Sequence, residues 1–91
     1  MHRVVITGVG CVSALGLTAP AHIKATREGV SGLATVTAVD PARLLCKVAG
    51  EVKGLVPAGH LDRKTLNMSD RVAGLALIAG AEAIADSGLS F

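Results

Sequence analysis

Large aromatic side chains are almost absent from this sequence of 91 residues, which has no tryptophan, no tyrosine and a single phenylalanine, Phe91. Its hydrophobic residues, 51% of the chain, are therefore mainly alanine, valine, leucine and isoleucine. Such small side chains fill a core only where elements pack very closely, and a domain of this length buries only about 60–65% of its unfolded surface. We therefore expect its apolar faces to be completed by partners outside these residues.

The sequence also lacks a large excess of one charge sign, because nine lysines and arginines are nearly balanced by seven aspartates and glutamates, for a net charge of +2. Basic residues do not form a run interleaved with aromatic residues, so we expect no nucleic acid partner. The longest uncharged stretch near the C-terminus, Val72–Ala81, is ten residues long. A membrane-spanning helix needs about 20 apolar residues, so we expect no membrane partner either.

Cysteine is limited to Cys11 and Cys46, and neither belongs to a C-x-x-C pair. The three histidines, His2, His22 and His60, fall at no metal-ligand spacing. Because no signal peptide is recognisable, we expect a cytoplasmic, reducing compartment and two buried thiols without a disulfide. A thiol without a neighbouring base is inert, so both cysteines are predicted to be structural, with His22 and His60 as ordinary surface groups. No metal or cofactor is predicted.

The chain is organised around its opening, where Val4–Ile6 is a run of β-branched apolar residues. A run that is apolar on both faces predicts a strand buried between two layers. Gly8 and Gly10 then end the strand, because glycine lets the backbone turn where a side chain would clash. A G-x-G after a strand also suits a nucleotide site, but the dinucleotide fingerprint needs a third glycine where Ser13 stands. Nucleotide binding is therefore the weaker alternative.

A first helix and a second strand follow. Thr18 as N-cap, Pro20 in the first turn and Gly29 after the last residue predict a helix over residues 19–28. The connection that follows is expected to last until Leu44. Residues 46–53 then alternate, with Cys46, Val48, Gly50 and Val52 on one face and three charged residues on the other. This alternation predicts a half-exposed strand near a sheet edge, with the cysteine face inward.

The last helix is predicted from about Asp70 to Ser87, capped by Ser69 or Asn67 and ended by Gly88. Its interior is apolar nearly all round, which predicts burial on most sides. Gly74 and Gly80 each cost about 1 kcal/mol relative to alanine in a helix interior. Such glycines are tolerated where another backbone comes very close, so we expect a close neighbour at both.

The order of these segments resembles the opening of β-ketoacyl-[acyl-carrier-protein] synthases, the condensing enzymes of fatty-acid synthesis, and is closest to the type I and type II elongating synthases. The resemblance covers the whole chain, so residues 1–91 are interpreted as the incomplete N-terminal segment of one synthase domain. Five segments carry it in register: 3–16 (RVVITGVGCVSALG), 27–33 (REGVSGL), 48–53 (VAGEVK), 61–64 (LDRK), and 68–71 (MSDR) leading into 83–89 (AIADSGL).

This resemblance implies an α/β, thiolase-like fold, of which the chain supplies the N-terminal portion: buried strand, helix, half-exposed strand and buried helix. It implies an acyltransferase that forms a homodimer and catalyses decarboxylative Claisen condensation of an acyl thioester with malonyl-carrier protein. The cysteine elbow and the histidine loops that perform this reaction in the family are absent from these residues. No catalytic residue is therefore carried over, and the fragment alone is expected to be inactive.

The resemblance also implies a docking role for Arg63 and Lys64, because they match the basic segment that binds the acidic acyl carrier protein in the family. Family members commonly add a further basic residue before the methionine that follows, whereas here Thr65–Met68 is uncharged and a residue shorter. The alternative for this pair is a solvated basic patch without a partner. For the whole protein, the alternative is a non-catalytic partner similar to a chain-length factor.

Overall fold

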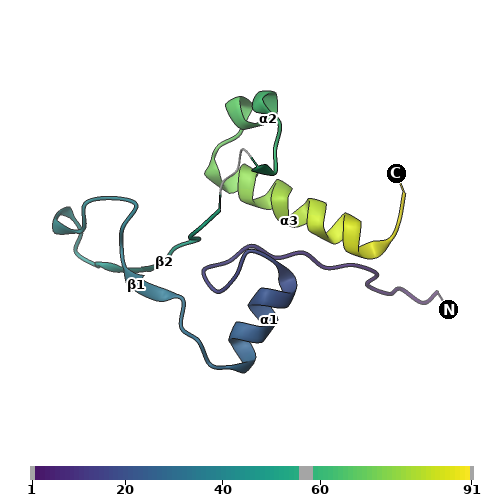
Figure 1. Cartoon of the computed structure of the whole chain (residues 1–91), viewed down its shortest axis with the longest axis horizontal. Helices are drawn as coiled ribbons and strands as arrows, with labels where there is room; N and C mark the ends of the chain where they lie inside the picture. Colours follow the sequence, from purple (N-terminus) through teal and green to yellow (C-terminus); the bar gives the residue numbers. More distant parts are fainter. Residues whose placement is uncertain (1, 56–58, 91) are drawn as a thin grey trace. The chain divides into compact units, whose positions relative to one another are not determined.

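A computed structural model describes residues 2–55 and 59–90 of the chain (Figure 1). The residues divide into two compact units, one formed by Val12–Leu55 and the other by Met1–Cys11 together with Val56–Phe91. The secondary structure is of mixed α/β type. Its elements are α1 (Ala19–Arg27), β1 (Leu33–Thr35), the short 3-10 helix η1 (Pro41–Arg43), β2 (Val48–Gly50), α2 (Arg63–Met68) and α3 (Arg71–Ser87).

Helix α1 forms as its local sequence predicts. The Thr18 side chain accepts a hydrogen bond from the Ala21 N–H at 3.3 Å, and Pro20 lies in the first turn, where an N–H has no partner in any helix. Glu28 is the C-cap and Gly29 has φ +70°, a left-handed conformation that glycine adopts without strain. The predicted helix is confirmed, one residue shorter at its C-terminal end.

The second strand forms over Val48–Gly50 and pairs antiparallel with β1, so that Leu33 faces Gly50 and Thr35 faces Val48. β1 lies within the stretch that the sequence predicted to be a connection. The predicted inward face is wrong, because Val48 is 55% exposed and Cys46 is exposed, whereas Ala49 is half-buried. A two-stranded sheet cannot bury a face without a covering layer, and alternation alone does not say which face receives one.

A carboxylate closes this hairpin beyond the paired residues. Glu51 accepts hydrogen bonds from the Thr37 N–H at 2.9 Å, the Thr37 hydroxyl at 2.9 Å and the Ala38 N–H at 2.8 Å. The Thr37 and Ala38 N–H groups and the Thr37 hydroxyl hold the pKa of Glu51 below its ordinary value, because all of them favour the charged form. Glu51, predicted on the outer face of the second strand, thus joins the residues that follow β2 to those that follow β1.

Helix α3 has the predicted length, from Arg71 to the C-cap Gly88 at φ +72°. Asp70 is its N-cap, accepting the Ala73 N–H at 2.8 Å, so the prediction of Ser69 or Asn67 as cap is wrong. Burial on most sides is wrong as well, since Ile78 is the one buried residue of this helix. In the described part of its unit, α3 is covered only by the six-residue α2 and by the backbone around Gly8 and Gly10, so most of its surface stays exposed.

The predicted strand at Val4–Ile6 is also wrong, because the structure has no strand over residues 2–12. Val4 is 94% exposed and Ile6 is 85% exposed. A strand needs a neighbouring strand to bond its backbone, and in the described residues the two strands present pair with each other. The segment instead contacts α3 through Gly8 and Gly10. The buried hydrophobic residues described are Ala19, Ala25 and Ile78.

Candidate functional site

The two predicted docking residues, Arg63 and Lys64, open helix α2 side by side. Helix α2 begins there because the Asp62 carboxylate accepts the Thr65 N–H at 2.7 Å, which satisfies one of the free N–H groups of the first turn. The sequence predicted only a polar, basic segment at this place. The available signal for the cap was Asp62 itself, because aspartate is among the preferred N-cap residues.

The helix dipole of α2 disfavours the positive charges of Arg63 and Lys64 in its first turn. A helix N-terminus carries partial positive charge, so a basic side chain in the first turn is unfavourable by about 0.3–1 kcal/mol. The Asp62 carboxylate lies at the same end, and hydrogen bonds from the Thr65 side chain and backbone N–H keep its pKa below the ordinary value. Arg63 and Lys64 are both exposed. They therefore present their charges to solvent from a capped helix end.

An open groove of about 480 Å³ lies between the start of α2 and one side of α3. Asp62 and Thr65 belong to its wall, so the groove borders the basic pair. Gly80 has open space where a Cβ would stand, which leaves the α3 wall shallow. The predicted close approach at Gly80 is therefore wrong for the described residues. The remaining lining residues are His60, Leu61, Ala76, Leu77, Ala81 and Ile84.

The two cysteines lie in different surroundings. Cys11 is half-buried, and its backbone N–H donates to Glu82 Oε1 at 2.8 Å. Cys46 is exposed, and its thiol donates to the Val48 carbonyl at 3.5 Å. The prediction of a buried Cys46 is wrong because the strand face on which it was placed has no cover. Both thiols are free, as predicted.

His22 differs from the surface residue that the sequence predicted. Its Nδ1 lies 2.7 Å from Ser13 Oγ in a half-buried pair, and Ser13 Oγ also accepts the Leu15 N–H at 3.2 Å. The Ser13 N–H donates to the Gly16 carbonyl at 2.8 Å. This pair fixes the turn over residues 13–16 onto α1. Sequence reasoning missed it because Ser13 and His22 lie in different elements.

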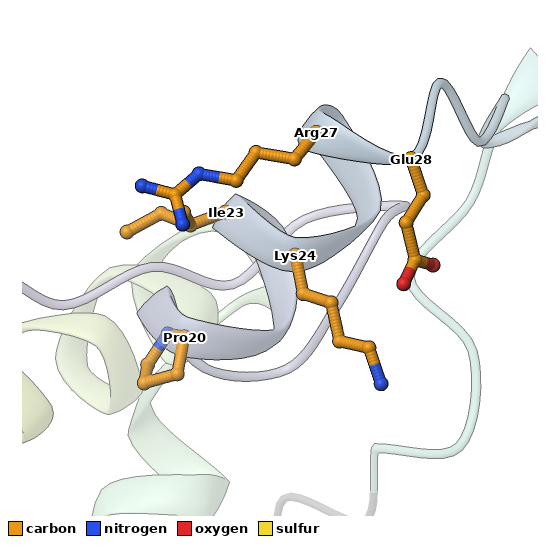
Figure 2. Close-up of a pocket in the computed structure, with 5 residues that line it drawn as sticks. All are labelled: Pro20, Ile23, Lys24, Arg27 and Glu28. Carbon is orange, nitrogen blue, oxygen red and sulfur yellow. The ribbon is translucent and has the colours of Figure 1, made fainter.

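A second group of charged residues lies on α1, where a shallow hollow is lined by Pro20, Ile23, Lys24, Arg27 and Glu28. Figure 2 shows the Arg27 side chain lying beside Ile23, whereas Lys24 and Glu28 extend away from them. Lys24 and Arg27 lie in the last turn of the helix, where positive charge is favourable. These two cations thus stabilise their helix, in contrast to the pair on α2.

The described residues contain neither of two further classes of site. Histidine, cysteine, aspartate and glutamate side chains do not gather there in a group of three that could hold a metal ion. Nor is any helix in that part of the chain both long enough and apolar enough to span a membrane.

Comparison with known proteins gives a consistent result over the whole length. Residues 1–91 match the family described as "Beta-ketoacyl synthase, N-terminal domain". Nodulation protein E of Rhizobium sp. (strain N33) is 40% identical over 89 residues, which are 98% of this chain and 22% of that protein.

Two further relatives agree. The putative polyketide beta-ketoacyl synthase 2 of Streptomyces coelicolor is 40% identical over 86 residues, 94% of this chain and 20% of the relative. The 3-oxoacyl-[acyl-carrier-protein] synthase 2 of Synechocystis sp. is 34% identical over 87 residues, 96% of this chain and 21% of the relative. The chain thus spans about a fifth of the length of the curated relatives that it matches.

Proposed function

The chain belongs to the β-ketoacyl synthase N-terminal domain family, and from this we propose that it is the N-terminal part of a β-ketoacyl-[acyl-carrier-protein] synthase. The complete protein would catalyse decarboxylative Claisen condensation of an acyl thioester with malonyl-carrier protein in fatty-acid biosynthesis. It would have a thiolase-like fold in which residues 1–91 form the first portion of one domain. We propose that it acts in the cytoplasm as a homodimer.

The family match over the whole chain is the observation that carries this proposal. It favours a synthase over a small nucleotide-binding protein. A non-catalytic partner similar to a chain-length factor would share the same N-terminal segment, and the presence of the cysteine elbow in the complete protein distinguishes the two. The fragment alone is proposed to be inactive, because Cys11 and Cys46 lack the thiol–imidazole pairing that acyl transfer requires.

We further propose that Arg63 and Lys64 dock the acyl carrier protein. Their place in the first turn of α2 supports the proposal, since cations there destabilise the helix and serve no local partner that the described residues provide. An acidic partner would gain from exposed, adjacent charges mainly through faster association. The name of one relative, the 3-oxoacyl-[acyl-carrier-protein] synthase 2 of Synechocystis sp., agrees with a carrier-linked substrate.

The test is a double charge reversal, Arg63→Glu with Lys64→Glu, in the complete enzyme. Each exposed charge contributes about 0.2–1 kcal/mol to binding, so loss of both contributions should raise KM for carrier-linked substrates about two- to thirtyfold. Turnover of a small, carrier-free thioester should not change. High salt should reduce the difference between variant and parent, because salt screens exposed charges.

The matched control is Lys24→Glu with Arg27→Glu, which reverses the same number of charges on α1. If the control raised KM as much as the test variant, net charge rather than docking would explain the result. If the test variant left KM and its salt dependence unchanged, the docking role would be withdrawn.

A further inference from the structure

The N-terminal segment is attached to α3 by hydrogen bonds that replace those of a neighbouring strand. The Val9 N–H donates to Asp86 Oδ2 at 3.0 Å, and the Cys11 N–H donates to Glu82 Oε1 at 2.8 Å. Donors two residues apart lie on the same edge of an extended chain. Acceptors four residues apart lie on the same face of a helix. The distance between the two N–H groups along the segment therefore matches the distance between the two carboxylates along α3, and each N–H meets one carboxylate.

The glycines of the segment supply a second, steric component of the same attachment. A Cβ on Gly10 would overlap the Ala79 carbonyl oxygen and lie 2.8 Å from the Ala83 nitrogen. A Cβ on Gly8 would overlap the Ala83 carbonyl oxygen and lie 2.8 Å from the Ser87 Cα. The backbone of the segment therefore lies directly on the backbone of α3 and runs antiparallel to it, as Figure 1 allows the reader to follow.

We propose that Glu82 and Asp86 form a two-point clamp that holds the N-terminal segment on α3 in the register that Gly8 and Gly10 allow. A slip by one residue would bring Val9 into a place where only glycine fits. A slip by two residues would bring Ile6 or Val12 there, although N–H groups two residues along the chain would still reach the carboxylates. The glycines thus exclude both slips, and the two carboxylates hold the segment in the register that remains.

The clamp also determines which side chains of the N-terminal segment face away from α3. Gly8 and Gly10 face α3, and side chains alternate along an extended backbone. Thr7, Val9 and Cys11 therefore lie on the opposite face, away from the helix. Val4–Ile6 lies beyond the last clamped N–H and is exposed. The two carboxylates would hold this apolar end at one fixed offset from α3, ready for pairing with a further strand, without taking part in that pairing themselves.

The test uses amide hydrogen exchange of the 91-residue chain, read residue by residue by NMR. Glu82→Ala removes the acceptor and should raise the exchange rate of the Cys11 amide about tenfold or more. Glu82→Gln keeps an acceptor oxygen without its charge and should raise the rate by only about two- to fivefold. Asp86→Ala should act in the same way on the Val9 amide.

Two reference amides separate a clamp from a general effect on stability. The His22 N–H bonds Thr18 in α1 and the Gly74 N–H bonds Asp70 in α3, and neither should change. Glu28→Ala, which removes an exposed carboxylate from the C-cap of α1, is the matched control. An equal rise at Cys11 and Gly74, or no rise at Cys11, would overturn the proposal.

If Glu82→Ala fails to fold, the chemical shift of the Cys11 amide proton in Glu82→Gln tests whether this N–H is bonded to the Glu82 carboxylate. Loss of a charged acceptor should move that resonance upfield, and an unchanged shift would overturn the clamp.

Discussion

At the residue scale, the glycines of this chain have opposite roles that their spacing does not reveal. Gly10→Ala should destabilise the unit that contains α3 by about 1–3 kcal/mol, because the new methyl group would overlap the Ala79 carbonyl oxygen and force the segment off the helix. Gly80→Ala is the matched control within α3. It adds the same methyl group in open space and should stabilise the helix by about 0.5–1 kcal/mol.

Amide hydrogen exchange along α3 would measure both changes, because it reports local opening and does not need one sharp unfolding transition. Equal effects of the two substitutions would contradict the direct backbone contact at Gly10.

The same scale shows which single residues sequence reasoning could place. Thr18 and Gly88 were predicted correctly because capping depends on neighbours within four residues. Asp70 was predicted one step out of position, in the first turn instead of at the cap, because Asn67, Ser69 and Asp70 are all good capping residues. His22 was predicted wrongly because its partner Ser13 comes from the preceding loop. Local interactions can be read from the sequence, and contacts between elements cannot.

At the scale of elements, the β1–β2 hairpin should depend on pH through Glu51. Hydrogen bonds from Thr37 and Ala38 lower the pKa of this carboxyl in the folded state. A group with a depressed pKa stabilises the fold above its unfolded value, about 4.3 for glutamate, and that stabilisation is lost as the pH falls through the lower folded value. The hairpin should therefore be held at neutral pH and should open in acid.

The amide proton shifts of Thr37 and Ala38 between pH 7 and pH 2 would follow this change. Both should titrate together with a midpoint below about 4.3, and Glu51→Gln should abolish the titration. A midpoint above that value would show that the three hydrogen bonds do not favour the charged form.

The elements also differ in how far the sequence predicts them. Helices α1 and α3 were predicted nearly to the residue, because caps, glycines and periodicity all act within one element. The strand expected at Val4–Ile6 was not found, because strand formation requires a partner that the residue pattern cannot supply. β1 was missed for the same reason: Leu33–Thr35 becomes a strand through pairing with Val48–Gly50. For the candidate site, the docking role of Arg63 and Lys64 stays a prediction, and the sequence did not indicate the helix that these residues open.

At the scale of the whole molecule, the family assignment came from five segments in register, and the whole-length match confirms it. Burial was the property that the sequence predicted worst. Apolar composition shows that a surface will be covered, but not by which residues. Val4, Ile6 and Val72 were all predicted to be buried and are 94%, 85% and 76% exposed. Their cover would have to come from residues that this chain does not place over them.

This exposure leads to the last prediction, that the isolated chain associates with itself and unfolds without a sharp transition. Large apolar side chains are exposed in both units, among them Val4 at 94% and Leu45 fully exposed, while the buried hydrophobic residues described are two alanines and Ile78. Each unit therefore has little core to unfold cooperatively and much surface that water disfavours. Sedimentation velocity should show concentration-dependent oligomers, and a hydrophobic dye should bind.

Val4→Lys with Ile6→Lys should reduce both signals, whereas the control Lys24→Gln with Arg27→Gln should not, because it removes charge without covering apolar surface. A strict monomer with a sharp thermal transition and no dye binding would contradict this view of the fragment, since it would require that the exposed side chains find cover within the chain itself.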